Sequence, residues 1–90
     1  MTNAKHRRNE LDIIASILQT TKEGCLKTQI MYKANLSFTQ LNDYVDFLLN
    51  NRLITQINRT EGDCKEVYVI TKKGVDFLQV HRELLRLLKT

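Results

Sequence analysis

The sequence has no proline, only three glycines and no long apolar run. A chain without proline can form helices that no residue interrupts from within. A membrane-spanning helix needs roughly 18 consecutive apolar residues, and no stretch approaches that length, so no membrane association is expected. The first ten residues are basic and no apolar run follows them, so no secretory signal is visible and a cytoplasmic location is expected.

Motifs for catalysis and metal binding are also missing. Cys25 and Cys64 lie far apart without CxxC spacing, so two free thiols are expected rather than a disulfide framework or a metal site. There is no glycine-rich phosphate loop, no HExxH motif and no cysteine with a recognisable partner base. We therefore expect no enzyme, no cofactor and no metal, and no small-molecule ligand is evident.

The charge distribution divides the chain into basic and acidic segments. Its 90 residues suffice for one domain with a modest core, and its net charge of +4 permits contact with polyanions. By segment the charge is +2 for residues 1–10, +2 for 25–36 and +3 for 71–90, but −2 for 37–50. The positive charge therefore lies outside the segment 37–50.

Two helices are predicted before residue 36. Asn9 can cap a helix over residues 9–21, and Gly24 suits a left-handed stop after it. A second, short helix fits residues 27–34 and is followed by a turn. The apolar residues of the first helix recur at helical spacing and are Leu11, Ile14, Ile17 and Leu18.

The third helix has the best-marked beginning in the chain. Ser37 and Gln40 have the spacing of a capping box, and Leu36 and Leu41 occupy the two positions of a hydrophobic staple. The opposite face is polar and carries aspartates but neither lysine nor arginine. The predicted core face consists of Phe38, Leu41, Val45, Leu48 and Leu49.

A hairpin and a last helix are predicted after residue 52. Residues 53–58 and 65–70 are rich in β-branched and aromatic side chains, and Gly62 lies in the turn between them. Thr71 can cap a helix that runs to about Lys89. The first half of this helix is expected to pack on its own domain through Val75, Phe77 and Leu78.

The order of elements is helix, helix, tight turn, helix, hairpin, helix. This is the layout of a winged helix-turn-helix domain, an α+β but mainly α fold with a three-helix core and a two-stranded wing. We predict a flexible basic arm over residues 1–8, the domain over 9–70 and a C-terminal helix over 71–90. Such folds also serve as protein-docking modules, so the pattern alone leaves the function open.

Two stretches, KTQIMYKANLSFTQLNDYVDFLLNNRLI and VYVITKKGVDFL, resemble the small archaeal winged-helix proteins, which are transcription regulators and chromatin-associated DNA binders. The resemblance extends from about Leu11 to Leu78. It implies binding to double-stranded DNA and, in many members, a homodimer built through the C-terminal helix.

The sequence departs from the pattern of this family at three places. Gln29 stands where a basic residue is frequent, and Asn42 and Asp43 stand where lysines are common. These two departures weaken the expected phosphate contacts. Arg52 stands where glycine is usual, which leaves the end of the third helix without its usual glycine stop, although Asn51 can take a left-handed conformation.

In a helix-turn-helix protein the second helix of the pair enters the major groove, while surrounding groups hold phosphates. Gln40 can bond adenine, Thr39 can touch a thymine methyl and Asp43 can accept from cytosine. Alternatively, the polar residues only cap and solubilise the helix. The predicted DNA-binding residues are Lys5, Arg7, Arg8, Lys27, Thr28, Gln29, Lys33, Ser37, Thr39, Gln40, Asp43, Tyr44, Arg59 and Lys65.

The end of the last helix, LLRLL at residues 84–88, places four leucines in five positions. An exposed apolar patch invites association, and an antiparallel pairing of two such helices is the simplest way to cover it. Alternatively, the helix folds back onto the first helix of a monomer. The predicted dimer-interface residues are Leu78, His81, Leu84, Leu85, Leu87 and Leu88.

We therefore predict a homodimeric DNA-binding protein, either a transcription regulator or a chromatin-associated protein of the nucleoid. An aspartate that faces phosphate repels it, so the cations of the arm, the second helix and the wing must provide the affinity. The alternative is a protein–protein interaction module whose acidic third helix docks on a basic partner.

Overall fold

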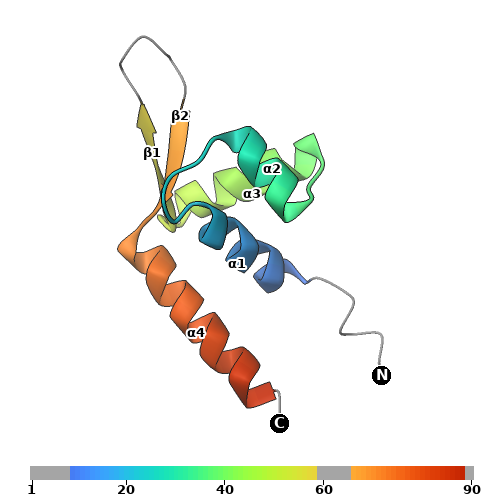
Figure 1. Cartoon of the computed structure of the whole chain (residues 1–90), viewed down its shortest axis with the longest axis vertical. Coiled ribbons are helices and arrows are strands. Elements are labelled where there is room, and N and C mark those ends of the chain that lie inside the picture. The colour runs from blue at the N-terminus through green and yellow to red at the C-terminus, as the bar shows by residue number, and fades with distance from the viewer. Residues whose placement is uncertain (1–8, 59–65, 89–90) are drawn as a thin grey trace.

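The computed structural model describes residues 9–58 and 66–88, and these residues form the predicted helices and strands (Figure 1). The predicted boundaries differ from the observed ones by no more than one residue, and the mainly helical fold class is confirmed. The turn of the hairpin, with Gly62, lies outside the described residues. The elements are α1 (Glu10–Thr20), α2 (Lys27–Ala34), α3 (Phe38–Asn50), β1 (Ile54–Asn58), β2 (Glu66–Ile70) and α4 (Lys72–Leu88).

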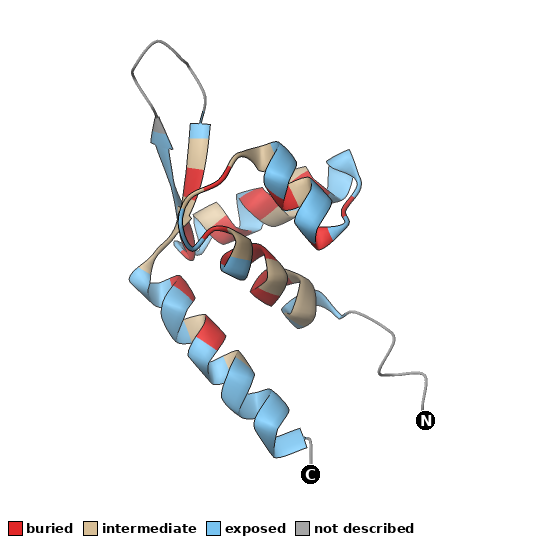
Figure 2. Ribbon diagram, viewed as in Figure 1, coloured by how far each residue is buried: buried red, intermediate tan, exposed pale blue. Residues whose placement is uncertain are grey.

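The core lies between the helices, and Figure 2 shows the buried residues on the inner parts of α1, α2 and α3. The helix α1 packs against both α2 and α4, and α3 packs against α2 and β1. The burial of one large aliphatic side chain contributes about 1.5–3 kcal/mol. The large aliphatic side chains with 0–2% exposure are Ile17, Leu18, Ile30, Leu41, Val45, Leu48 and Ile54.

Three side chains that were predicted to pack in the core are exposed instead. Leu11 is 45% exposed, Phe38 is 67% exposed and Val75 is 39% exposed. Each lies within the first four residues of its helix, and in each helix the side chain three positions later is buried. The helical periodicity was therefore read correctly, but the core begins one turn later than predicted.

The left-handed residue at the end of α3 is Arg52 and not Asn51. Asn51 has φ −92°, whereas Arg52 has φ +61° and takes the left-handed position itself. Leu53 N donates to Leu48 O at 2.9 Å and Arg52 N donates to Leu49 O at 3.0 Å, which is the pair of bonds of a Schellman motif. These bonds hold arginine in a conformation that glycine adopts more easily.

A short backbone bridge ties the base of the hairpin to the connection between α1 and α2. Cys25 N donates to Tyr68 O at 3.0 Å, and Tyr68 N donates to Cys25 O at 2.9 Å. Both side chains are buried, and burial raises the pKa of the Cys25 thiol, an effect that Lys33 partly opposes. Burial also raises the pKa of Tyr68, and the carboxylate of Glu66 beside its hydroxyl adds to this shift. No sequence pattern predicted this bridge.

The start of α4 is joined to the end of α3 through Thr71. Its hydroxyl donates to Arg52 O at 2.7 Å and accepts from Gly74 N at 3.1 Å, which confirms Thr71 as the cap of the helix. Gly74 is buried against this junction. A Cβ atom at Gly74 would lie 2.4 Å from Leu53 O and 2.6 Å from Ile70 Cγ1.

We expect Gly74→Ala to destabilise the protein by about 1–3 kcal/mol, because the added methyl group overlaps backbone and a branched side chain that cannot move aside. Alanine is about 1 kcal/mol more favourable than glycine inside a helix. This gain in helix propensity opposes the loss of stability from the steric overlap. Urea unfolding followed by circular dichroism measures the difference. Lys73→Ala, at an exposed neighbouring position, serves as the control. A Gly74→Ala variant as stable as the parent would show that α4 can shift away from the hairpin.

Candidate nucleic-acid interface

The turn between α2 and α3 orients the two helices. Asn35 ends α2 in the left-handed conformation with φ +56°, and Leu36 N donates to Met31 O at 3.0 Å. Leu36 and Leu41 are both buried, as expected for the two members of a hydrophobic staple. A left-handed asparagine, a staple and the cap of α3 therefore define the angle at which α3 leaves α2.

The outer face of α3 is exposed and acidic. Its buried positions are Leu41, Val45 and Leu48, which lie on one side of the helix. The side chains on the opposite side are Thr39, Asp43, Asp46 and Asn50, and all four are exposed. Since α3 contains no lysine or arginine, it presents two carboxylates and no cation to any ligand that approaches this face.

Two of the residues predicted to contact DNA bases make hydrogen bonds that hold the start of α3. Ser37 Oγ accepts from Gln40 N at 3.1 Å, and Gln40 Oε1 accepts from Ser37 N at 3.0 Å. The capping box is therefore formed. A bidentate contact between the Gln40 amide and adenine would require Oε1 to leave the cap, whereas the amide nitrogen can still donate.

A second glutamine caps α2. Gln29 Oε1 accepts from Leu26 N at 2.8 Å, so this predicted DNA-binding residue holds the beginning of its own helix. This role could not be predicted from the sequence, because Leu26 at the N-cap position has no side-chain hydrogen-bond acceptor. Beside it, Thr28 and Lys33 are exposed and Lys27 is half-buried. Both lysines of α2 thus lie at the surface near the helix-turn-helix.

The remaining predicted cations cannot be placed. Lys5, Arg7 and Arg8 of the arm and Arg59 and Lys65 of the hairpin turn lie outside the described residues. The contribution of the arm and the wing tip to an interface therefore stays a prediction.

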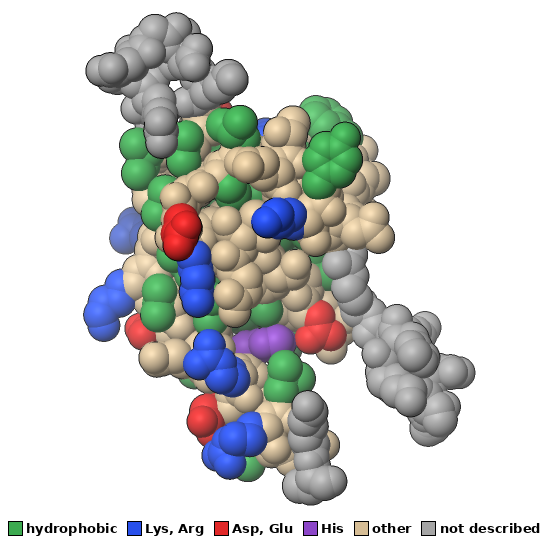
Figure 3. Space-filling view, viewed as in Figure 1, with side chains coloured by type: hydrophobic (Ala, Val, Ile, Leu, Met, Phe, Trp, Pro, Cys, Tyr) green, Lys and Arg blue, Asp and Glu red, His purple; other side chains and the backbone are tan. Residues whose placement is uncertain are grey.

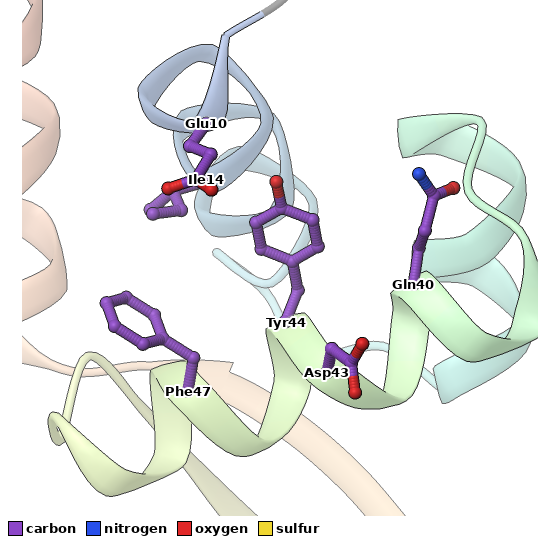
Figure 4. Close-up of a pocket in the computed structure, with 6 residues that line it drawn as sticks. All are labelled: Glu10, Ile14, Gln40, Asp43, Tyr44 and Phe47. Carbon is purple, nitrogen blue, oxygen red and sulfur yellow. The ribbon is translucent and has the colours of Figure 1, made fainter.

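A pocket of about 350 Å³ opens between α1 and the flank of α3 (Figure 4). Two predicted DNA-binding residues besides Gln40 line it, the half-buried Tyr44 and the exposed Asp43. We refer to it as the α1–α3 pocket. It is lined by Glu10, Ile14, Gln40, Asp43, Tyr44 and Phe47.

The helix α4 has two halves in different environments. Its first half packs on the domain, and Leu78, predicted at the dimer interface, is instead buried in the core of its own chain at 4% exposure. Its second half extends beyond the body of the molecule (Figure 1). Leu84 and Leu85 are 43% and 44% exposed, and Leu87 and Leu88 are 65% and 73% exposed. Only the first half folds back onto α1, so four of the six predicted interface residues offer an apolar surface.

His81 lies where α4 meets the body and is the histidine visible in Figure 3 beside an acidic side chain. Its Nε2 is 3.2 Å from Asp12 Oδ1 of α1, and its ring stacks on Phe77 with the centroids 6.2 Å apart. His81 was predicted in a dimer seam with a hydrogen bond. The bond exists, but its partner is in the same chain, so His81 marks the limit of the packed half of α4.

Within residues 9–58 and 66–88, no three histidine, cysteine, aspartate or glutamate side chains gather as a metal site. No helix of this part of the chain is long and apolar enough to cross a membrane.

The contribution of the α3 capping box to the free energy of unfolding can be measured separately from any role of these residues in binding. We expect Ser37→Ala to lower the free energy of unfolding by about 1 kcal/mol, because the first turn of α3 loses its side-chain acceptor. Thr39→Ala, two residues away on the exposed face, makes no capping bond and should leave the stability within about 0.5 kcal/mol of the parent. Chemical unfolding of the two variants compares them. Equal stabilities would mean that the cap contributes nothing to the position of α3.

Comparison with known proteins agrees with this geometry. A model of the family described as Winged helix-turn-helix matches residues 7–89. An uncharacterized protein of Methanocaldococcus jannaschii is 32% identical over 89 residues, which span 98% of this chain and 84% of that protein. A second uncharacterized protein of the same archaeon is 37% identical over 83 residues, but the matched region spans 36% of its length.

Solved structures share the fold. Sso10a-2, a DNA-binding protein from Sulfolobus solfataricus, superposes with a TM-score of 0.78 at 21% identity over 89% of this chain and 81% of that one. The transcriptional regulator BldR from the same organism superposes with a TM-score of 0.73 at 25% identity. That match covers 84% of this chain and 55% of BldR.

Proposed function

This chain belongs to the winged helix-turn-helix family, and from this premise we propose that it binds double-stranded DNA as a homodimer. In this role it acts as a transcription regulator or as a chromatin-associated protein of the nucleoid. The observation that carries the proposal is the outer face of α3, which is exposed, polar and held at a defined angle by the turn before it. A recognition helix must present such a face to enter a major groove.

The charge of α3 determines what kind of DNA binding is proposed. Asp43 and Asp46 repel phosphates, so α3 adds shape and selectivity rather than affinity. Lys27 and Lys33 lie on the helix that precedes it and supply cations beside the groove-facing surface. The affinity is proposed to come from these lysines together with the predicted basic arm and wing.

The structural neighbours support this proposal at the level of the fold. One is a DNA-binding protein and another is a transcriptional regulator, and both are from an archaeon, as are the two relatives in sequence. A weakly selective reader held by peripheral cations suits a chromosome-coating protein as well as a regulator, so the proposal covers both roles.

The proposed homodimer rests on the exposed half of α4. Four leucines within five positions leave an apolar surface that stays 43–73% exposed in the described part of the chain. Two copies of this half, packed antiparallel, would bury the leucines of both and would place two reading helices on one duplex. The charged neighbours Arg82 and Arg86 remain at the edge of such a pairing.

We expect binding to a 20-base-pair duplex, followed by fluorescence anisotropy, to weaken steeply as salt increases. Each neutralised phosphate contributes about 0.9 to the slope of log K against log salt, so Lys27→Ala and Lys33→Ala should each reduce that slope by about one. Arg82→Ala removes the same charge from the second half of α4 and should leave the slope unchanged. Asp43→Asn should strengthen binding to a non-specific duplex.

One alternative function is favoured by a specific observation, the lack of any cation on the acidic face of α3. That face would also suit a basic protein partner. Absence of micromolar duplex binding even at 20 mM salt would contradict DNA binding and favour the protein-docking function.

We expect Leu88→Glu to convert the dimer into a monomer, because a buried, unpaired carboxylate is costly in an apolar interface. Sedimentation velocity measures the change directly. Gln79→Glu adds the same charge at an exposed polar position of the same helix and should leave the dimer intact. A parent protein that sediments as a monomer at 100 μM would refute the proposed pairing.

A further inference from the structure

The α1–α3 pocket has a lining that the helix-turn-helix function does not require. Glu10 is in the first turn of α1 and Asp43 is in the middle of α3, so an acidic residue from each of two helices lines the pocket. Figure 4 shows the Glu10 carboxylate turned toward α3 and the Asp43 carboxylate on the other side of Tyr44. Neither carboxylate makes an ion pair with another residue in the described part of the chain. The negative charge of the pocket is therefore not neutralised from within the described structure.

The remaining walls of the pocket are apolar or aromatic apart from Gln40, whose side-chain oxygen is held in the cap of α3. Ile14 is 5% exposed and forms part of the apolar wall, while Phe47 is 48% exposed and lies toward the opening. Figure 4 shows Tyr44 and Phe47 extending from α3 toward α1, and the carboxylate of Glu10 extending from α1 toward them. The pocket thus combines acidic groups with aromatic rings at one place.

These two features select one class of ligand. Carboxylates attract a cation, and the face of an aromatic ring attracts the same charge through its quadrupole. An anion would be repelled by both carboxylates, and a neutral ligand would leave them without a partner. The volume of about 350 Å³ is at the lower end of the range of about 300–1,000 Å³ that is usual for small-molecule sites.

We propose that the α1–α3 pocket binds a small organic cation with an ammonium or guanidinium head and a short apolar body. The head lies at the carboxylate of Glu10, with Asp43 on the other side of Tyr44 adding to the negative potential (Figure 4), and the body contacts Tyr44, Phe47 and Ile14. The pocket joins the body of the domain to its groove-facing helix, so its occupant can influence what α3 binds.

The influence on DNA follows from charge, and this step rests on the proposed function. Asp43 is one of the two carboxylates by which α3 repels phosphates. A cation bound beside it neutralises that charge, so occupancy of the pocket should strengthen duplex binding. By linkage, bound duplex should strengthen binding of the cation by the same factor.

The site is tested first on the protein alone, without DNA. We propose titration of the ¹⁵N-labelled chain with n-butylguanidinium, and with n-butylurea as a neutral ligand of the same shape, followed by two-dimensional NMR. The expected result is saturable shifts of the amides that line the pocket, with butylurea bound at least about tenfold more weakly. Phe47→Leu should weaken binding of the cation without any change of charge.

Matched variants separate the pocket from general attraction of cations to an acidic helix. Glu10→Gln and Asp43→Asn should each weaken binding of the cation about fivefold. Asp46→Asn removes the same charge three residues further along α3, outside the pocket, and should have no effect. All these side chains are at the surface, and the amide spectrum itself reports whether each variant is folded. Equal binding of butylurea, or equal losses in Asp43→Asn and Asp46→Asn, would overturn the proposed site.

The coupling to DNA is tested separately by anisotropy with a non-specific duplex at constant ionic strength. Saturating butylguanidinium, compared with butylurea, should raise the affinity about two- to fivefold, and Glu10→Gln should raise the cation concentration needed for half of this increase about fivefold. Binding of the cation in the pocket without any gain in duplex affinity would overturn the coupling and leave the site established. Failure to bind duplex under any condition would refute the proposed function, whereas the NMR titration would still decide the site.

Discussion

The burial of one face of α3 is the constraint on which the rest of this structure depends. Leu41, Val45 and Leu48 are 0–1% exposed, so the helix cannot rotate about its axis without bringing aliphatic side chains into water. That rotation also determines which residues point outward, and those include Asp43 and Asp46. The acidic character of the outer surface of α3 is therefore a direct consequence of how the core is packed.

Under the proposed function, the acidic outer face of α3 implies that affinity and selectivity come from different elements of the domain. In that proposal α3 contributes shape and a few polar groups, while cations on neighbouring elements supply attraction to a polyanion. The capping bonds of Gln29 and Gln40 strengthen this view, because two side chains of suitable type for base contacts are occupied in holding the helices. The α1–α3 pocket lies where these roles meet, since Asp43 belongs both to the outer face of α3 and to the pocket wall.

The last helix shows how one periodic pattern can serve two surfaces. Leu78, His81, Leu85 and Leu88 follow one alternation of three and four residues, yet Leu78 is buried in its own chain and Leu85 and Leu88 are exposed. The change occurs near His81, whose imidazole contacts Asp12 in the first turn of α1. Among the described residues, the leucines of α4 beyond that point are 43–73% exposed, which is the reason that a second copy is proposed to cover them.

The sequence by itself determined the elements, their order and the family, because capping boxes, helical periodicity and a change to alternating β-branched residues are local signals. It also showed that the third helix is acidic. Only the tertiary structure decided that Phe38 is exposed, that Arg52 rather than Asn51 is left-handed, that Cys25 bridges to Tyr68, and that Leu78 is unavailable to a partner. The pocket was also invisible in the sequence, because Glu10 and Asp43 are brought together by the packing of helices and not by their spacing along the chain. Local sequence patterns indicate which secondary structure a segment favours. The exposure of a side chain and its distance from other residues depend instead on which other segments pack against that segment.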